Sequence, residues 1–82
     1  MKVLKIGDKL CKGCAIMRPI WKEIEEEFPL LETEYYEFKD NKELAEQYNV
    51  EVIPTFIFLE DNKEVARLVG EVDKDAIIEI IW

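Results

Sequence analysis

Hydrophobic and polar residues recur along this chain in segments that have the period of a strand or of a helix. Residues 2–6 alternate charged and apolar side chains and stop at Gly7, which predicts a short strand followed by a loop. Residues 13–28 carry their apolar side chains at helical spacing, which predicts a helix with one apolar stripe. The stripe consists of Met17, Ile20, Trp21, Ile24 and Phe28. Pro19 removes a hydrogen bond inside this helix and is expected to kink it, and Pro29 is expected to end it.

A second strand and a short helix are predicted in the middle of the chain. Residues 33–38 are rich in β-branched and aromatic side chains, which favour a strand. Asp40 or Asn41 is expected to cap a helix over residues 42–48. Asn49 follows this helix and is expected to end it in a left-handed conformation.

The last third of the chain predicts a hairpin and a final helix. The unbroken apolar run at 55–59 is typical of a strand that is buried on both faces. A polar turn at 60–63 joins it to a strand at 65–69, which Gly70 closes. Asp73 is expected to cap a helix whose inward side chains are Ala76, Ile77, Ile80 and Ile81.

The resulting order is β-α-β-α-β-β-α, which indicates the α/β class. Two β-α-β steps predict parallel neighbours joined by right-handed crossovers, and the short turn at 60–63 predicts an antiparallel pair. We therefore expect a mixed four-stranded sheet flanked by helices, with 2–6 and 55–59 as its central strands. With 82 residues, the chain is expected to form one domain over residues 1–82.

Composition narrows the possible partners. The formal net charge of −8 argues against nucleic acid and against an anionic membrane surface, because both require a basic face. No apolar run reaches the roughly 18 residues of a membrane span, and residues 1–10 do not form the apolar core of a signal peptide. We therefore expect a cytoplasmic protein with no membrane and no nucleic-acid partner.

Two cysteines, Cys11 and Cys14, stand two residues apart and are the only cysteines in the chain. Thiols at this spacing can form a small disulfide and reopen it, so a redox pair is the leading interpretation. Zinc usually needs four ligands, and the chain has no histidine and no second cysteine pair. A metal ion or an iron–sulfur cluster shared by a dimer stays an alternative, as does a pair of unreactive cysteines.

The same region resembles the active-site helix of the thioredoxin superfamily. The motif Cys11-Lys12-Gly13-Cys14 is followed by Met-Arg-Pro-Ile at 17–20, which is similar to the family's helix with its internal proline. Residues 41–55, Asn-Lys-Glu-Leu-Ala-Glu-Gln-Tyr-Asn-Val-Glu-Val-Ile-Pro-Thr, resemble the family's helix and cis-proline loop. Gly70 matches the glycine after the last strand, and the resemblance covers residues 3–81. It implies a minimal thioredoxin fold, close to glutaredoxin in size.

The resemblance also suggests roles for individual residues. Cys11 should lie just outside a helix N-terminus, where free N–H groups stabilise a thiolate, so we expect it to be the nucleophile and Cys14 the resolving thiol. Lys12 and Gly13 lie between them and are expected to tune the redox equilibrium. The resemblance implies a cis Ile53–Pro54 bond, with the backbone of Ile53 free to pair with an extended substrate. The expected apolar rim for substrate consists of Leu10, Ile53, Pro54, Thr55 and Gly70.

Some positions depart from the family pattern. Thioredoxins usually carry a tryptophan before the first cysteine and Gly-Pro between the pair, whereas this chain has Leu10 and Lys12-Gly13. Lys5 occupies the position of a buried aspartate that the family uses in proton transfer at the second cysteine. Glutaredoxins carry a double glycine after the last strand, whereas here a single Gly70 precedes Glu71. These residues favour thioredoxin-type substrates over glutathione.

We therefore expect a monomeric dithiol–disulfide oxidoreductase that reduces protein disulfides. It would need no cofactor and no metal, and it would receive electrons from a protein of the thioredoxin-reductase type. The alternatives are a glutathione-dependent glutaredoxin, a non-catalytic thioredoxin-like binding module and a carrier of a cysteine-ligated metal.

Overall fold

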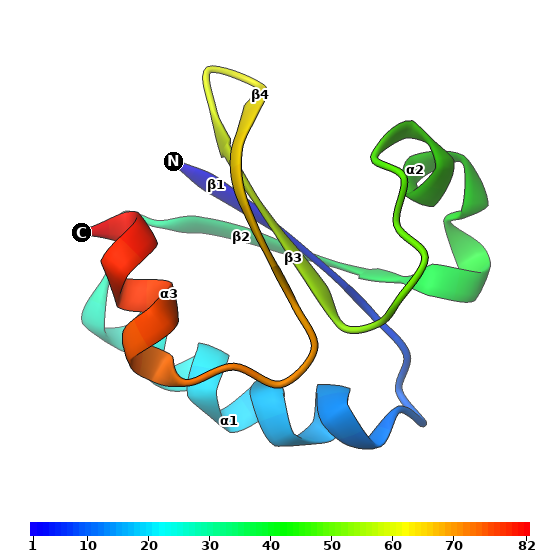
Figure 1. Cartoon of the computed structure of the whole chain (residues 1–82). Helices are drawn as coiled ribbons and strands as arrows, with labels where there is room; N and C mark the ends of the chain where they lie inside the picture. Colours follow the sequence, from blue (N-terminus) through cyan, green and yellow to red (C-terminus); the bar gives the residue numbers. More distant parts are fainter.

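A computed structural model describes all residues, 1–82, and contains the predicted elements in the predicted order (Figure 1). The strands pair in the order β2-β1-β3-β4, so β1 and β3 are central, as predicted. A short 3-10 helix, η1, was not predicted; it follows β2 and lies ahead of α2. The elements are β1 (Lys2–Gly7), α1 (Lys12–Glu27), β2 (Glu32–Glu37), η1 (Phe38–Asp40), α2 (Lys42–Gln47), β3 (Thr55–Glu60), β4 (Lys63–Val69) and α3 (Lys74–Ile81).

Helices cover both faces of the sheet. Figure 1 shows α1 and α3 on one side of the strands and α2 on the other. Side chains alternate along β1 and β3, so each strand contributes to two cores. The core under α1 and α3 consists of Val3, Met17, Trp21, Ile24, Phe56, Phe58 and Ile77. The core on the α2 side consists of Leu4, Ile6, Ala45, Val50, Ile57 and Leu59.

The prediction of two parallel strand pairs is wrong in its second step. β1 and β2 are parallel, with Gly7 opposite Glu37, but β3 runs antiparallel to β1, with Thr55 opposite Ile6. The end of β2 and the start of β3 therefore lie at the same end of the sheet, and residues 38–54 connect them there. The six residues of α2 span only about 9 Å, whereas a six-residue strand spans about 20 Å. This helix is too short to carry the chain back along the sheet.

The predicted helix ends are only partly stabilised by side chains. Asn41 and Asp73 stand at the N-caps of α2 and α3, but neither side chain makes a capping hydrogen bond. Asn41 instead donates from Nδ2 to the carbonyl of Glu37 at 2.8 Å. Asn49 has a φ of 54°, which confirms the predicted left-handed residue after α2.

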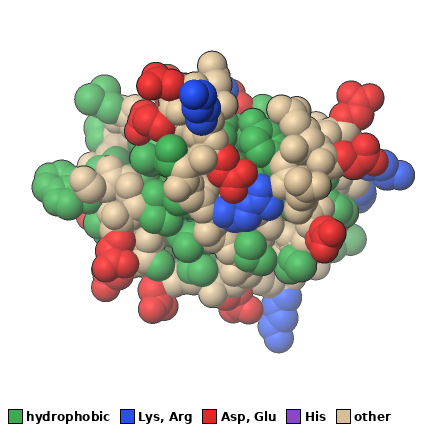
Figure 2. Space-filling view, turned by 45° about the horizontal axis from the view of Figure 1, so that its top comes forward, with side chains coloured by type: hydrophobic (Ala, Val, Ile, Leu, Met, Phe, Trp, Pro, Cys, Tyr) green, Lys and Arg blue, Asp and Glu red, His purple; other side chains and the backbone are tan.

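One end of the sheet brings together segments from across the chain. The end of β1 leads into α1, the loop before β3 lies beside it, and the end of β4 returns to the same place (Figure 1). Acidic side chains are scattered over the face drawn in Figure 2 rather than gathered in a patch. None of the three α-helices combines the length and apolar character that a membrane crossing requires.

Candidate active site

The two cysteines occupy the first turn of α1. Cys11 is the N-cap residue and is partly exposed, whereas Cys14 is only 5% exposed. Both are free thiols, and the backbone N–H of Cys14 donates to Sγ of Cys11 at 3.3 Å. An N–H group that points at sulfur from a helix N-terminus stabilises a thiolate there. The pair therefore has one accessible sulfur with anion-stabilising surroundings and one sulfur beneath it.

Burial makes the thiol of Cys14 a weaker acid than an ordinary cysteine. Its pKa is raised from 9.0 to about 11, mainly by burial and secondly by its hydrogen bond with Cys11. The backbone N–H of Asp8 donates to Sγ of Cys14 at 3.5 Å and partly opposes this shift. At neutral pH the protonated form of Cys14 predominates, so its proton has to leave when the thiol reacts.

Gly7 makes room for the buried sulfur. A β-carbon at position 7 would lie 2.8 Å from Sγ of Cys14, closer than real β-carbons approach other atoms. The sequence pattern predicts Gly7 only as the end of a strand, so this contact with Cys14 comes from the structure alone. The available signal was a glycine that directly precedes the loop leading to a cysteine pair.

The proline loop lies against the cysteine turn. The Ile53–Pro54 bond is cis, as the family resemblance implied. Cδ of Pro54 lies 3.4 Å from the point where a β-carbon on Gly13 would stand, so the loop borders the residues between the two sulfurs. The N–H of Gly70 donates to the carbonyl of Pro54 at 2.7 Å. This bond ties the end of β4 to the same site.

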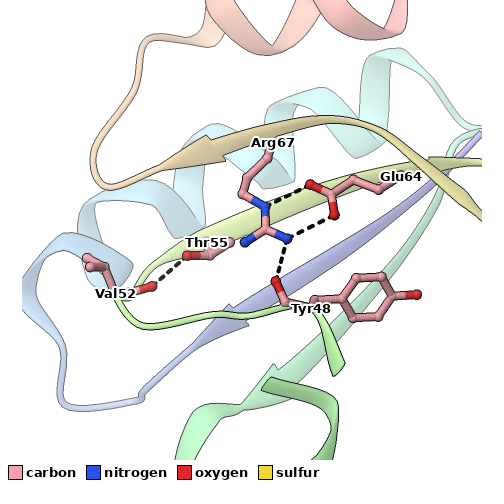
Figure 3. Close-up of polar contacts among 5 residues, drawn as sticks. All are labelled: Tyr48, Val52, Thr55, Glu64 and Arg67. Carbon is pink, nitrogen blue, oxygen red and sulfur yellow. Dashed lines mark hydrogen bonds and ion pairs between the residues drawn. The ribbon is translucent and has the colours of Figure 1, made fainter. Parts of the chain in front are cut away.

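Polar contacts hold the segment ahead of Pro54 in place (Figure 3). The hydroxyl of Thr55 donates to the carbonyl of Val52 at 2.5 Å. Arg67 of β4 donates to the carbonyl of Tyr48 at 2.5 Å and holds both carboxylate oxygens of Glu64, at 2.8 and 2.9 Å. Arg67 was not among the predicted site residues, because nothing in the sequence joins it to a loop nineteen residues away.

The residues expected to form a substrate rim differ in exposure. Leu10 is 84% exposed, Ile53 and Gly70 are partly exposed, and Pro54 and Thr55 are buried. The structure brings Pro54 and Gly70 together beside Gly13, while Leu10 and the exposed Lys12 flank Cys11 in the chain. Val52, which was not predicted, adds an apolar side chain that is 56% exposed.

A cavity of about 110 Å³ lies behind Cys14, and Lys5, Trp21, Glu25 and Tyr35 are among the residues that line it. Lys5 is paired with Glu25 at 2.6 Å and lies over the ring of Trp21 at 5.6 Å. Burial disfavours the charged form of Glu25, but hydrogen bonds from Lys5 and Thr33 outweigh it and lower its pKa. The lysine at the position of the family's aspartate is therefore part of an ion pair between β1 and α1.

Comparisons with known proteins find thioredoxins, both by sequence and by structure. The family model described as Thioredoxin matches residues 3–82. Thioredoxin of Chlamydia caviae is 38% identical over 71 residues, which cover 87% of this chain and 70% of that protein. The structure of Fasciola hepatica thioredoxin is 30% identical, with a TM-score of 0.89 over 98% of this chain and 76% of that one. Thioredoxin 1 of Thermosipho africanus is 25% identical, with a TM-score of 0.87 over 99% of this chain and 90% of that one.

The matched proteins and the local geometry indicate the same chemistry, thiol–disulfide exchange. Thioredoxins act on disulfide-containing proteins and typically need no cofactor. Here the two sulfurs stand in one helical turn, and a cis-proline loop lies beside them. The chain belongs to the thioredoxin family and is a thiol–disulfide oxidoreductase that works through its Cys11–Cys14 pair.

Proposed function

We propose that the protein reduces protein disulfides with Cys11 as nucleophile and Cys14 as resolving thiol. The difference in burial between the two cysteines supports this assignment, since Cys14 is only 5% exposed while Cys11 is partly exposed. The N–H of Cys14 supports the thiolate of Cys11. Lys12, the next residue in the chain, adds positive charge near this sulfur, and Gly13 lies beside the proline loop.

The reaction requires two exchange steps. The Cys11 thiolate attacks a substrate disulfide, so a bond forms between Cys11 and one substrate sulfur while the other leaves as a thiolate. Cys14 then loses its proton and attacks Sγ of Cys11, which releases the second substrate thiolate and leaves a Cys11–Cys14 disulfide. The substrate gains two electrons, and a dithiol or a reductase protein must return two electrons to the pair.

The proposed substrate groove lies between the cysteine turn and the proline loop. Ile53 offers backbone groups to an extended segment of the substrate, as in β-strand addition. Leu10, next to Cys11 in the chain, and Val52, two residues before Pro54, provide exposed apolar surface. Thr55 and Gly70 hold the loop through their hydrogen bonds. Pro54 contributes the wall next to Gly13.

Residues 1–82 act as one domain, as a monomer in the cytoplasm. The electron donor is a protein of the thioredoxin-reductase type, and the two sulfurs alone carry the electrons, with no metal or other cofactor.

Trapping of the mixed disulfide tests the two roles. Cys14→Ser is expected to accumulate a stable covalent complex with a disulfide-containing protein, because nothing remains to attack Cys11. Cys11→Ser is expected to abolish exchange. Trapping by Cys11→Ser instead would mean that the roles are reversed. A reduction assay with either thioredoxin reductase or glutathione as the electron source then separates thioredoxin from glutaredoxin activity, and iron content of the purified protein tests for a cluster carrier.

A further inference from the structure

The carboxylate-bearing side chain of Glu71 lies against the cysteine turn. Its Cγ is 3.4 Å, and its Oε2 3.8 Å, from the point where a β-carbon on Gly13 would stand. The Cδ of Pro54 lies 3.4 Å from the same point. Glu71 therefore borders the strip of backbone between the two sulfurs, beside the proline loop.

The backbone on both sides of Glu71 is anchored. The N–H of Gly70 donates to the carbonyl of Pro54 at 2.7 Å. The N–H of Val72 donates to the sulfur of Met17 at 3.4 Å, and Met17 is a core residue of α1. These two contacts hold the backbone of Glu71 at a defined position relative to the proline loop and to α1.

The carboxylate of Glu71 has no partner within the molecule. The six ion pairs use the carboxylates of other glutamates, and none of the side-chain hydrogen bonds involves Glu71, whose side chain is exposed. Lys9 and Lys12, near Cys11, are exposed and take part in no ion pair either. Near Cys11 the rim of the site therefore presents these two lysines together with the carboxylate of Asp8, which accepts from the N–H of Leu10 at 2.8 Å. Next to Gly13 and Pro54 it presents the unpaired carboxylate of Glu71.

We propose that Glu71 determines charge specificity: it favours protein substrates that carry an arginine or lysine next to the disulfide cysteine and disfavours those that carry an acidic residue there. This inference rests on the proposed function, because it describes how the same groove selects its substrates. A substrate segment that docks along the proline loop excludes water from the carboxylate. The attraction to a cation and the repulsion of an anion both become stronger as water is removed.

A pair of peptide disulfides tests the preference. The two peptides are identical except for arginine or glutamate next to the cysteine that is attacked, and kcat/KM for their reduction is measured with dithiothreitol as the electron source. The wild-type protein is expected to prefer the arginine peptide. In Glu71→Gln the ratio of the two values should fall about two- to ten-fold, because the exposed ion pair with the arginine peptide and the repulsion of the glutamate peptide are both lost. In Glu71→Lys the preference should reverse.

A matched variant separates local contact from net charge. Glu26 is exposed on α1 and takes part in no ion pair, so Glu26→Gln makes the same chemical change away from the site. It should leave the ratio unchanged, and the wild-type preference should shrink in about 1 M salt, where the Debye length is about 3 Å.

The outcomes are distinct. An unchanged ratio in Glu71→Gln, or an equal fall in Glu26→Gln, would overturn the role of Glu71 while leaving the proposed reduction of disulfides intact. Failure of the wild-type protein to reduce either peptide would overturn the proposed function and this inference together.

Discussion

Gly7→Ala is the substitution whose effect follows most directly from the structure. The new methyl group would stand 2.8 Å from Sγ of Cys14, about 0.7 Å or more short of an optimal non-bonded contact. The sulfur is buried beneath α1, so either Cys14 rotates away or α1 moves off the strand. Overpacking of this kind costs about 1–3 kcal/mol, and each kcal/mol lowers the melting temperature of a domain of this size by about 4–8 °C.

The same displacement should slow the resolving step. A shift of about 1 Å between reacting atoms can cost about a hundredfold in rate, so the mixed disulfide of Gly7→Ala should persist about 10- to 100-fold longer. Thermal unfolding of the reduced protein measures the first effect, and acid quenching during turnover measures the second.

Gly13→Ala is the matched control for Gly7→Ala. The nearest atoms to its new β-carbon lie at 3.4 Å, an ordinary contact, and alanine stabilises a helix relative to glycine by up to about 1 kcal/mol. This variant should therefore melt at or above the wild-type temperature. A Gly7→Ala protein that melts within about 2 °C of wild type and resolves at the wild-type rate would refute the argument.

Two further predictions concern the sulfurs. Lys12→Glu should lower the reduction potential by about 10–40 mV, because Lys12 favours the thiolate and hence the reduced form; a redox titration that gives an equal or higher potential would contradict this. In Cys11→Ser, where burial of Cys14 remains, the ultraviolet absorbance of the thiolate should titrate with a midpoint well above the ordinary 9.0, towards the value of about 11 in the native pair. Because the folded state holds this proton more tightly than the unfolded state, the free energy of unfolding should fall as the pH rises from about 9 to about 11. A midpoint at or below 9.0 would show that burial does not control this thiol.

Periodicity and composition identified the elements because each reflects local burial. The stripe that includes Met17 and Trp21 marks the buried face of α1, and the unbroken run at 55–59 marks a strand covered on both sides. The spacing of Cys11 and Cys14 placed both sulfurs in one helical turn, and the family resemblance placed Pro54 beside them. These features could be predicted because they depend on residues that are close in sequence or on a known motif.

The direction of β3 could not be predicted from the sequence, because it depends on where the connection through residues 38–54 lies in the folded protein. The apolar run at 55–59 is compatible with a parallel or an antiparallel strand, since both faces are buried in either case. The shortness of α2 and the position of residues 38–54 at one end of the sheet decided the antiparallel arrangement.

The sequence by itself determined the four strands, the three α-helices and the reactive pair, because hydrophobic burial leaves its period in the chain and helix geometry puts residues i and i+3 together. Only the tertiary structure decided which residues from distant parts of the sequence surround the two cysteines and the loop beside them. It set Gly7 under Cys14, joined Arg67 to the loop before Pro54, directed Lys5 to Glu25, and brought Glu71 against Gly13. These contacts join residues that are far apart in the sequence, and the local sequence does not encode them because the strand pairing and the packing of α1 on the sheet create them.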